Sequence, residues 1–166
     1  GAAVGSAVVW LAPGTAPAPL LAPLLAAAGD ALEAWWAAYM PLAAEAELVQ
    51  VQRVSPARRS AGRERLLART PALAALPRLR AGIPALPTPE APLSLGWLNY
   101  WSAATAHWLG FPDEARDAEW LSRSTRTPAG AWVWRLTEQP FELSRPEHLE
   151  ALARAYARFE RLAAQP

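Results

Sequence analysis

The chain has 166 residues, no cysteine and a net charge of +1 with its histidines neutral. This length suits a single domain, and with 52% hydrophobic residues the chain can bury a substantial core. The lack of cysteine excludes disulfide bonds and cysteine-ligated zinc, and it fits a cytoplasmic location. Proteins that bind nucleic acids usually carry a strong positive charge. The net charge here is close to zero, so we predict no nucleic acid partner.

The N-terminal part of the sequence predicts a strand followed by a long helix. Residues Val4–Ala12 contain a short apolar run typical of a strand, and the proline-rich Pro13–Pro19 is a linker. Apolar residues then recur at spacings of three and four, which predicts a helix over Leu20–Met40 or Pro23–Met40. A start at Pro23 would place this proline in the first turn of the helix, where proline is best tolerated.

The charged residues of this apolar helix argue against a location in a membrane. Asp30 and Glu33 lie in the middle of the apolar segment Leu20–Ala44 and argue against a membrane-spanning helix. Its polar side also lacks the basic residues of helices that lie on membranes. We therefore expect a helix packed against the core and no membrane partner.

The central part of the chain alternates between regular and irregular segments. Leu48–Val54 alternates apolar and polar residues like a half-buried strand, and Ala57–Arg69 is a short polar helix. Prolines recur through Thr70–Leu95, so this segment is expected to be irregular. Five arginines cluster before it, and we favour a solvated helix face over a phosphate-binding patch. They are Arg58, Arg59, Arg63, Arg65 and Arg69.

Tryptophan dominates the next stretch. Trp97, Trp101 and Trp108 are spaced so that they would share one side of a helix over Gly96–Phe111. Gly110 is suited to end this helix in the left-handed conformation. Aromatic residues in such numbers usually lie in the core, since each buried ring removes roughly 150–250 Å² from water.

The remaining sequence predicts two helices around a strand. Asp113–Ser122 reads as a short helix, Thr127–Gly130 as a turn and Ala131–Thr137 as a strand with alternating faces. Ser144–Glu147 matches a capping box that would begin a last helix ending near Ala163. The fold class predicted for the single domain 1–166 is therefore α+β. We expect a small, mostly antiparallel sheet covered by helices on one face, with a Trp-rich core.

The sequence offers few groups for chemistry. Neither of its two histidines, His107 and His148, has a second ligand four residues away, so we predict no metal, cofactor or catalytic site and no enzymatic activity. A run of carboxylates in one short helix reads as a solvated face rather than a cation site. It comprises Asp113, Glu114, Asp117 and Glu119.

Several segments together carry a family resemblance. They are Gly96–Ser102 with its W-L-x-[FY] pattern, Gly110–Glu119, Ala129–Thr137 and Pro146–Leu149. This pattern resembles the C-terminal part of an uncharacterised bacterial domain family akin to the immunity proteins of polymorphic and type VI toxin systems (immunity protein 52-like). The resemblance implies that the chain lacks a further N-terminal segment of that family. The matching residues have structural roles there, so it supplies no catalytic positions.

The resemblance implies a function exerted by binding. We expect an immunity-like protein that inhibits a cognate bacterial toxin by direct contact, with exposed arginines as anchors. Arg116, Arg123 and Arg126 are the candidate partner-binding residues. The alternatives are a structural or carbohydrate-binding module, and a hydrolase that uses His107 or His148. The sequence leaves the oligomeric state open.

Overall fold

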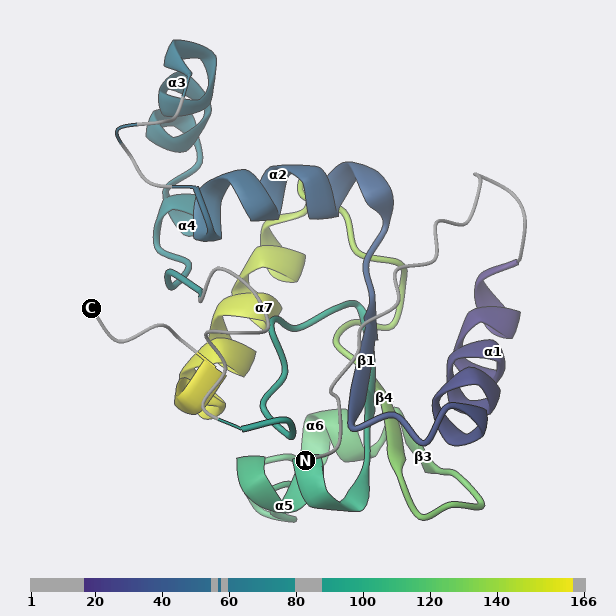
Figure 1. Ribbon diagram of the computed structural model, residues 1–166. Helices are drawn as coiled ribbons and strands as arrows, with labels where there is room; N and C mark the ends of the chain where they lie inside the picture. The colour runs from purple at the N-terminus through teal and green to yellow at the C-terminus, as the bar shows by residue number, and fades with distance from the viewer. Residues whose placement is uncertain (1–16, 55–56, 58–59, 80–87, 163–166) are drawn as a thin grey trace.

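The computed structural model describes residues 17–54, 57, 60–79 and 88–162 (Figure 1). The strands of this part form one antiparallel four-stranded sheet with the order β1-β2-β4-β3. They are β1 (Trp36–Tyr39), β2 (Leu98–Trp101), β3 (Ser124–Arg126) and β4 (Trp132–Arg135). The predicted strand Val4–Ala12 lies outside the described residues.

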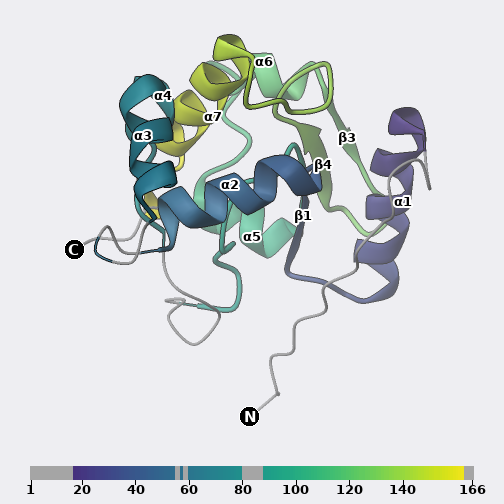
Figure 2. The ribbon, with the colours of Figure 1, turned by 90° about the horizontal axis from the view of Figure 1, so that it is seen from above.

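Helices pack on both sides of the sheet (Figures 1 and 2). They are α1 (Ala18–Ala31), α2 (Leu42–Gln52), α3 (Ala61–Arg69), α4 (Pro71–Ala74), α5 (Ala103–Leu109), α6 (Ala118–Leu121), α7 (Pro146–Arg158) and the 3-10 helix η3 (Glu160–Leu162). Most of them lie on the side of the large core, and α1 adds a layer against the opposite face of β1, β2 and β4. No helix in the described ranges has the length and apolar character needed to cross a bilayer.

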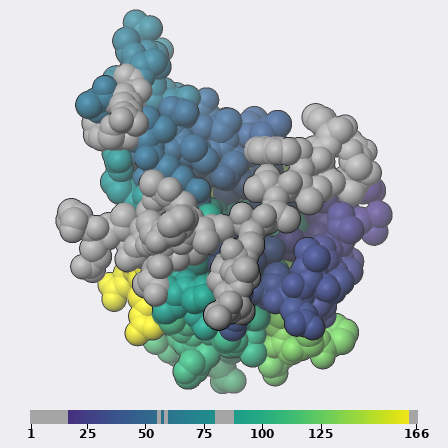
Figure 3. Space-filling model, in the orientation of Figure 1, coloured from purple at the N-terminus to yellow at the C-terminus, as the bar shows by residue number. Residues whose placement is uncertain are grey.

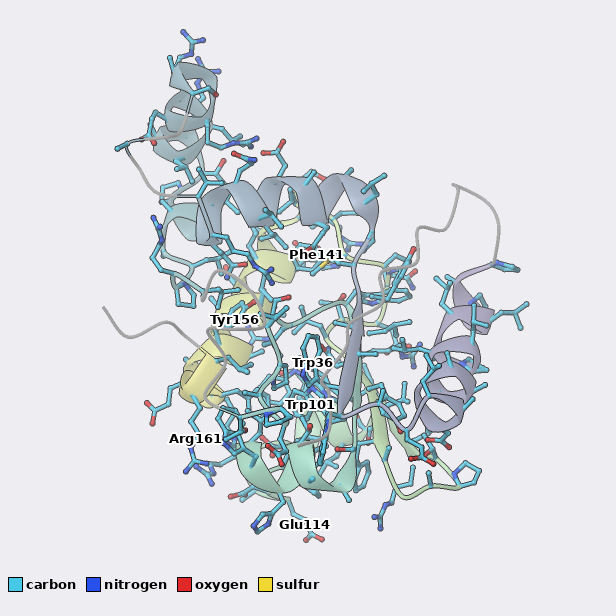
Figure 4. The ribbon with its side chains drawn as sticks, in the orientation of Figure 1. Trp36, Trp101, Glu114, Phe141, Tyr156 and Arg161 are labelled. Atoms are coloured by element: carbon cyan, nitrogen blue, oxygen red, sulfur yellow. The ribbon has the colours of Figure 1, made fainter. Side chains whose placement is uncertain are left out.

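A cluster of aromatic rings fills the core between the sheet and α7. The ring of Trp101 meets those of Trp134, Phe159 and Phe111 edge-on, with centroids 4.8, 4.9 and 5.3 Å apart. Figure 4 shows Trp101 in the interior between β1 and α7. Edge-to-face contacts of this kind add stability beyond the area that they bury. The predicted α+β class, antiparallel sheet and Trp-rich core are confirmed. The helices cover both faces of the sheet instead of the predicted one, because α1 packs on the second face.

The predicted helix over Gly96–Phe111 is wrong in its first half, where the chain forms β2. A spacing of four residues keeps Trp97 and Trp101 on one side of a helix or of a strand, so the pattern did not distinguish them. Residues 98–101 form a strand because their backbone groups pair with β1 and β4. Ser102 then begins α5, since its side chain accepts the N–H of Thr105 at 3.1 Å.

Other expectations for this stretch hold. Trp97 and Trp101 are buried, as predicted, whereas Trp108 is only half-buried. Gly110 ends α5 with a φ of +68°, the left-handed conformation expected there. Gly96 is needed for a different reason, because a Cβ at this position would lie 2.6 Å from the carbonyl oxygen of Tyr39.

The predicted helix from Leu20 to Met40 is too long. It begins at Ala18, which places Pro23 beyond the first turn, and it ends at Ala31. Glu33 follows with a φ of +47°, a left-handed conformation that redirects the chain. The residues after it enter β1, because hydrogen bonding along β2 outweighs their helical spacing.

The predicted strand Leu48–Val54 is wrong, because this segment belongs to α2. The residues that α2 buries include Ala44, Leu48 and Val51, which follow the spacing of one helix face. Alternation over seven residues was too short a signal, since the preceding alanines and glutamates favour a helix. The helix predicted over Ala57–Arg69 is present as the shorter α3, and Arg58 and Arg59 lie outside the described residues. The segment Thr70–Leu95, predicted to be irregular, contains the short helix α4.

The C-terminal elements differ from prediction mainly at their ends. The turn Thr127–Gly130 and the following strand are present, and the turn joins β4 to the unpredicted β3. The helix predicted over Asp113–Ser122 is reduced to α6. The capping box is wrong, because α7 begins after Arg145 without a side-chain cap. Proline at the first helical position makes the residue before it the cap.

Helix α1 is attached to the sheet by a small apolar cluster and one polar network. The Asp30 carboxylate accepts hydrogen bonds from the hydroxyls of Tyr100 and Thr127 at 2.9 and 2.8 Å, and from the N–H of Ala129 at 3.4 Å. Gly29 lies against the Tyr100 ring, where a Cβ would come within 2.5 Å. Desolvation raises the pKa of Asp30, but these hydrogen bonds outweigh it and hold the pKa below its usual value.

The aromatic cluster should carry much of the stability. We expect Trp101→Ala to lower the free energy of unfolding by about 3–5 kcal/mol, because it leaves a large cavity. Chemical denaturation measures the change. Trp35→Ala is the matched control, since Trp35 is exposed, and its effect should stay below about 1 kcal/mol. Equal effects of the two substitutions would contradict the core assignment.

The Asp30 network makes stability depend on pH in a defined direction. Because the folded pKa of Asp30 is depressed, its contribution is complete above the unfolded pKa of about 3.9 and is lost as the pH falls through the folded value. The stability difference between the wild type and Asp30→Asn should therefore be constant at neutral pH and shrink in acid. Urea unfolding across this range tests it, and a difference that grows in acid would refute the assignment.

Candidate functional site

A hollow of about 280 Å³ lies where the end of α5 meets the end of α7. Its distinctive residues are Arg116, Arg158 and Arg161, together with Trp108 and His107, and we call it the arginine hollow. Glu160 is the acidic side chain in its lining. Arginine and tryptophan are the residue types that dominate the binding energy of protein interfaces.

Arg158 forms the back of the arginine hollow through a buried ion pair. Its Nε and Nη2 donate to the two carboxylate oxygens of Asp117 at 2.8 and 3.1 Å, and Nη2 also donates to the carbonyl oxygen of Gly110 at 2.6 Å. The side chain of Asp117 is fully buried and that of Arg158 is 13% exposed. Asp117 also accepts the N–H of Asp113 at 2.8 Å. This pair fixes the end of α7 to the turn before α6.

Arg161 is held over the end of α5. Its guanidinium group lies 5.6 Å from the centre of the Trp108 ring, and it donates to the carbonyl oxygen of the same residue. A cation over an indole ring is attracted to the ring face. Figure 4 shows Arg161 at the surface beside α5. The carbonyl groups at the end of α5 therefore orient both arginines from the end of α7.

Arg116 contributes the most accessible cation. Its side chain is 64% exposed, and Nε donates to the Asp113 carboxylate at 2.7 Å. Bonds from Arg116, both through its backbone N–H and through its side chain, hold the pKa of Asp113 below its usual value. Arg116 lines the hollow, and its high exposure leaves it accessible to a ligand.

The three predicted anchors do not form one site. Arg116 lies in the arginine hollow, but Arg126 lies at the β3 edge, where its guanidinium group is 5.1 Å from the centre of the Trp132 ring. Arg123 is held by an ion pair with Glu119 at 3.0 Å and by the carbonyl oxygen of Leu136 at 3.1 Å. Its side chain is 17% exposed, so it is a poor anchor.

Two residues of the hollow, Arg158 and Arg161, were not identified from the sequence. Arg154, Arg158 and Arg161 are spaced four and three apart, which predicts a basic stripe on the last helix. The run of carboxylates was predicted to be solvated. This is wrong for Asp117, which is buried under Arg158. No sequence pattern separates Asp117 from its exposed neighbours.

A second hollow, also of about 280 Å³, contains charges of both signs and His148. Nδ1 of His148 accepts the N–H of Glu142 at 3.0 Å, which assigns the proton of the neutral ring to Nε2. Burial lowers the pKa of His148, and the Arg145 guanidinium lowers it further. The imidazole also packs against the Phe141 ring. It therefore stabilises the segment that precedes α7.

The remaining candidates form no catalytic or metal-binding group within the described ranges. His107 is exposed on α5 and borders the arginine hollow. In the described residues no group of three histidines or carboxylates is arranged to hold a metal ion. Of the arginine cluster, Arg63 pairs with Glu47, and Arg65 and Arg69 are exposed on α3, which projects from the molecule (Figure 3).

The ion pair below the arginine hollow should be critical for the fold. We expect Asp117→Asn to destabilise the protein by about 3 kcal/mol, because it leaves a mostly buried guanidinium group without its counter-charge. Glu147→Gln is the control, since it removes an exposed pair with Arg145 worth about 0–1 kcal/mol. Thermal and urea unfolding of both variants would show the difference. Similar small losses would mean that the pair is not needed.

Comparison with known proteins gives one match. The family model described as a domain of unknown function (DUF5953) matches residues 12–165. No curated protein and no solved structure matches the chain. Since the matched region includes the sheet, the arginine hollow and nearly all of the chain, this protein belongs to the DUF5953 family.

Proposed function

We propose that this protein acts by binding, as an immunity-like inhibitor that blocks a cognate bacterial toxin through direct contact. The observation that carries the proposal is the arginine hollow, where Arg116, Arg158 and Arg161 meet around Trp108. A guanidinium group presents a planar set of donors that matches a carboxylate. The partner surface that fits the hollow therefore projects an acidic side chain.

The arrangement of the hollow favours tight binding. Arg161 is already oriented by the carbonyl oxygen of Trp108, so it loses little conformational entropy when a partner binds. Arg158 is only 13% exposed and is paired with Asp117, so it forms the floor of the hollow rather than an anchor. Arg116 is the most exposed of the three arginines, and Asp113 holds its Nε in place. An inhibitor of this type needs no chemistry of its own, since it occludes the surface that it covers.

The resemblance to immunity proteins supports a toxin as the partner, and a cytoplasmic location belongs to the same proposal. The alternatives predict other observations. A carbohydrate-binding module would show quenching of tryptophan fluorescence by a sugar, and a hydrolase would show turnover that disappears in His107→Ala or His148→Ala.

The proposal is tested with the toxin encoded by the adjacent gene. The full chain should rescue growth when co-expressed with this toxin and should retain it in a pull-down. Arg116→Ala should weaken binding about thirtyfold, as expected for loss of a central anchor. Because Arg116 is exposed, its substitution should leave the fold intact.

Arg65→Ala serves as the control, since Arg65 is exposed on α3 at the other end of the molecule (Figure 1). It should leave both affinity and rescue unchanged. The proposal fails if the chain neither binds nor protects. If Arg116→Ala and Arg65→Ala have the same effect on affinity, the arginine hollow is not the binding surface.

A further inference from the structure

The large exposed hydrophobic side chains of the described residues all come from one stretch of sequence. They are Leu20, Leu24, Leu32, Trp35 and Leu42. Leu20 and Leu24 are 56% and 49% exposed on the outward side of α1, and Leu32, just after the helix, is 72% exposed. Gathered apolar side chains at a surface mark an interaction site more often than scattered ones.

The outward side of α1 has large residues at one end and small ones at the other. Leu20 and Leu24 lie in its N-terminal half, whereas the exposed positions of its C-terminal half are Ala27, Ala28 and Ala31. These positions recur at spacings of three and four, so they form one face of the helix. The ionisable residue within α1, Asp30, is bonded to Tyr100 and Thr127 of the sheet and hairpin.

We propose that this face of α1 is a dimer interface, in which α1 of a second copy packs antiparallel about a two-fold axis. Antiparallel packing places Leu20 of one copy opposite Ala31 of the other, and Leu24 opposite Ala27. Each large side chain then meets a small one, as interdigitating helices require. Parallel packing would set leucine against leucine and leave voids between the alanines.

The ends of the helix support the same orientation. Helix α1 begins at Pro17 without a side-chain cap and has no acidic residue in its first turn. Glu33 lies two residues beyond its C-terminal end. In the antiparallel dimer Glu33 of each copy approaches the positive N-terminal end of the other α1, where a carboxylate is favourable.

A protein partner suits this face better than a lipid surface. The first 52 residues contain four carboxylates and no basic residue. Helices that bind anionic membranes carry basic residues beside the apolar face, and carboxylates are repelled from such surfaces. A neutral apolar face with complementary ends instead fits a copy of itself, and two-fold dimers are the commonest homo-oligomers.

The size of the face sets the expected affinity. A 14-residue helix is about 21 Å long, so α1 alone offers less than the roughly 800 Å² per partner of a standard interface. Leu32 and Trp35 are further exposed apolar side chains in the segment that follows the helix. We therefore expect a reversible dimer with a Kd on the order of 10 µM.

Sedimentation velocity of the full chain from about 1 to 200 µM, a range that spans this Kd, should show a dimer that forms with increasing concentration. Leu24→Gln should weaken association at least about tenfold, because both copies lose a buried leucine. Leu42→Gln is the matched control, since Leu42 is equally exposed at the start of α2 but outside the α1 face. It should leave association unchanged, and circular dichroism should show both variants folded.

Orientation is tested by disulfide crosslinking, which is simplified because the chain has no cysteine. A mixture of the Leu20→Cys and Ala31→Cys variants should form mixed disulfide dimers, and each variant alone should crosslink far less. The proposal is overturned if the chain stays monomeric at 200 µM, or if Leu24→Gln and Leu42→Gln behave alike. Homotypic crosslinks in place of mixed ones overturn it too, as does Leu24-dependent binding to phosphatidylcholine vesicles by a monomer.

Discussion

The structure depends on strand β2, which is hydrogen-bonded along both edges and buried on both faces. It lies between β1 and β4, and its four residues are each no more than 2% exposed. Trp101 points into the large aromatic core, whereas Tyr100 reaches α1 on the other side. Asn99 is buried as well, and its side chain bonds both the N–H and the carbonyl oxygen of Gly96. A buried amide is tolerated here because it closes the turn before the strand.

Sequence patterns identified what is buried more reliably than the form of the backbone. The tryptophans of the 97–101 stretch were assigned to the core from their area and number, and this is correct. Their spacing could not separate a helix from a strand, because the pairing that decides comes from β1, some 60 residues earlier in the chain. In the same way, short alternation suggested a strand where α2 forms. The turn before β4 was predictable because glycine and proline act locally, and Gly130 indeed has a positive φ of 83°.

The candidate site was less accessible from the sequence, because it is made by segments that meet only in the folded chain. Arg158 comes from the last helix, whereas Asp117 and Gly110 come from turns more than 40 residues earlier. Nothing local marks Asp117 as the buried member of a carboxylate run. Arg116 was one of three candidate anchors, and the structure places it in a turn where a helix was predicted. The arginine hollow and the outward face of α1 lie on opposite sides of the sheet, so occupying one leaves the other free (Figure 2).

The attachment of α1 also has a consequence for motion. Most of its contacts with the sheet are made in a small cluster that contains Tyr100, Val133 and alanines, and its buried Leu21 joins the edge of the large core. The free energy needed to detach α1 is therefore smaller than that needed to unfold the whole sheet. We therefore expect the amide hydrogens of α1 to exchange through local openings that leave the tryptophan core assembled. Whatever covers its outward face slows this exchange as well.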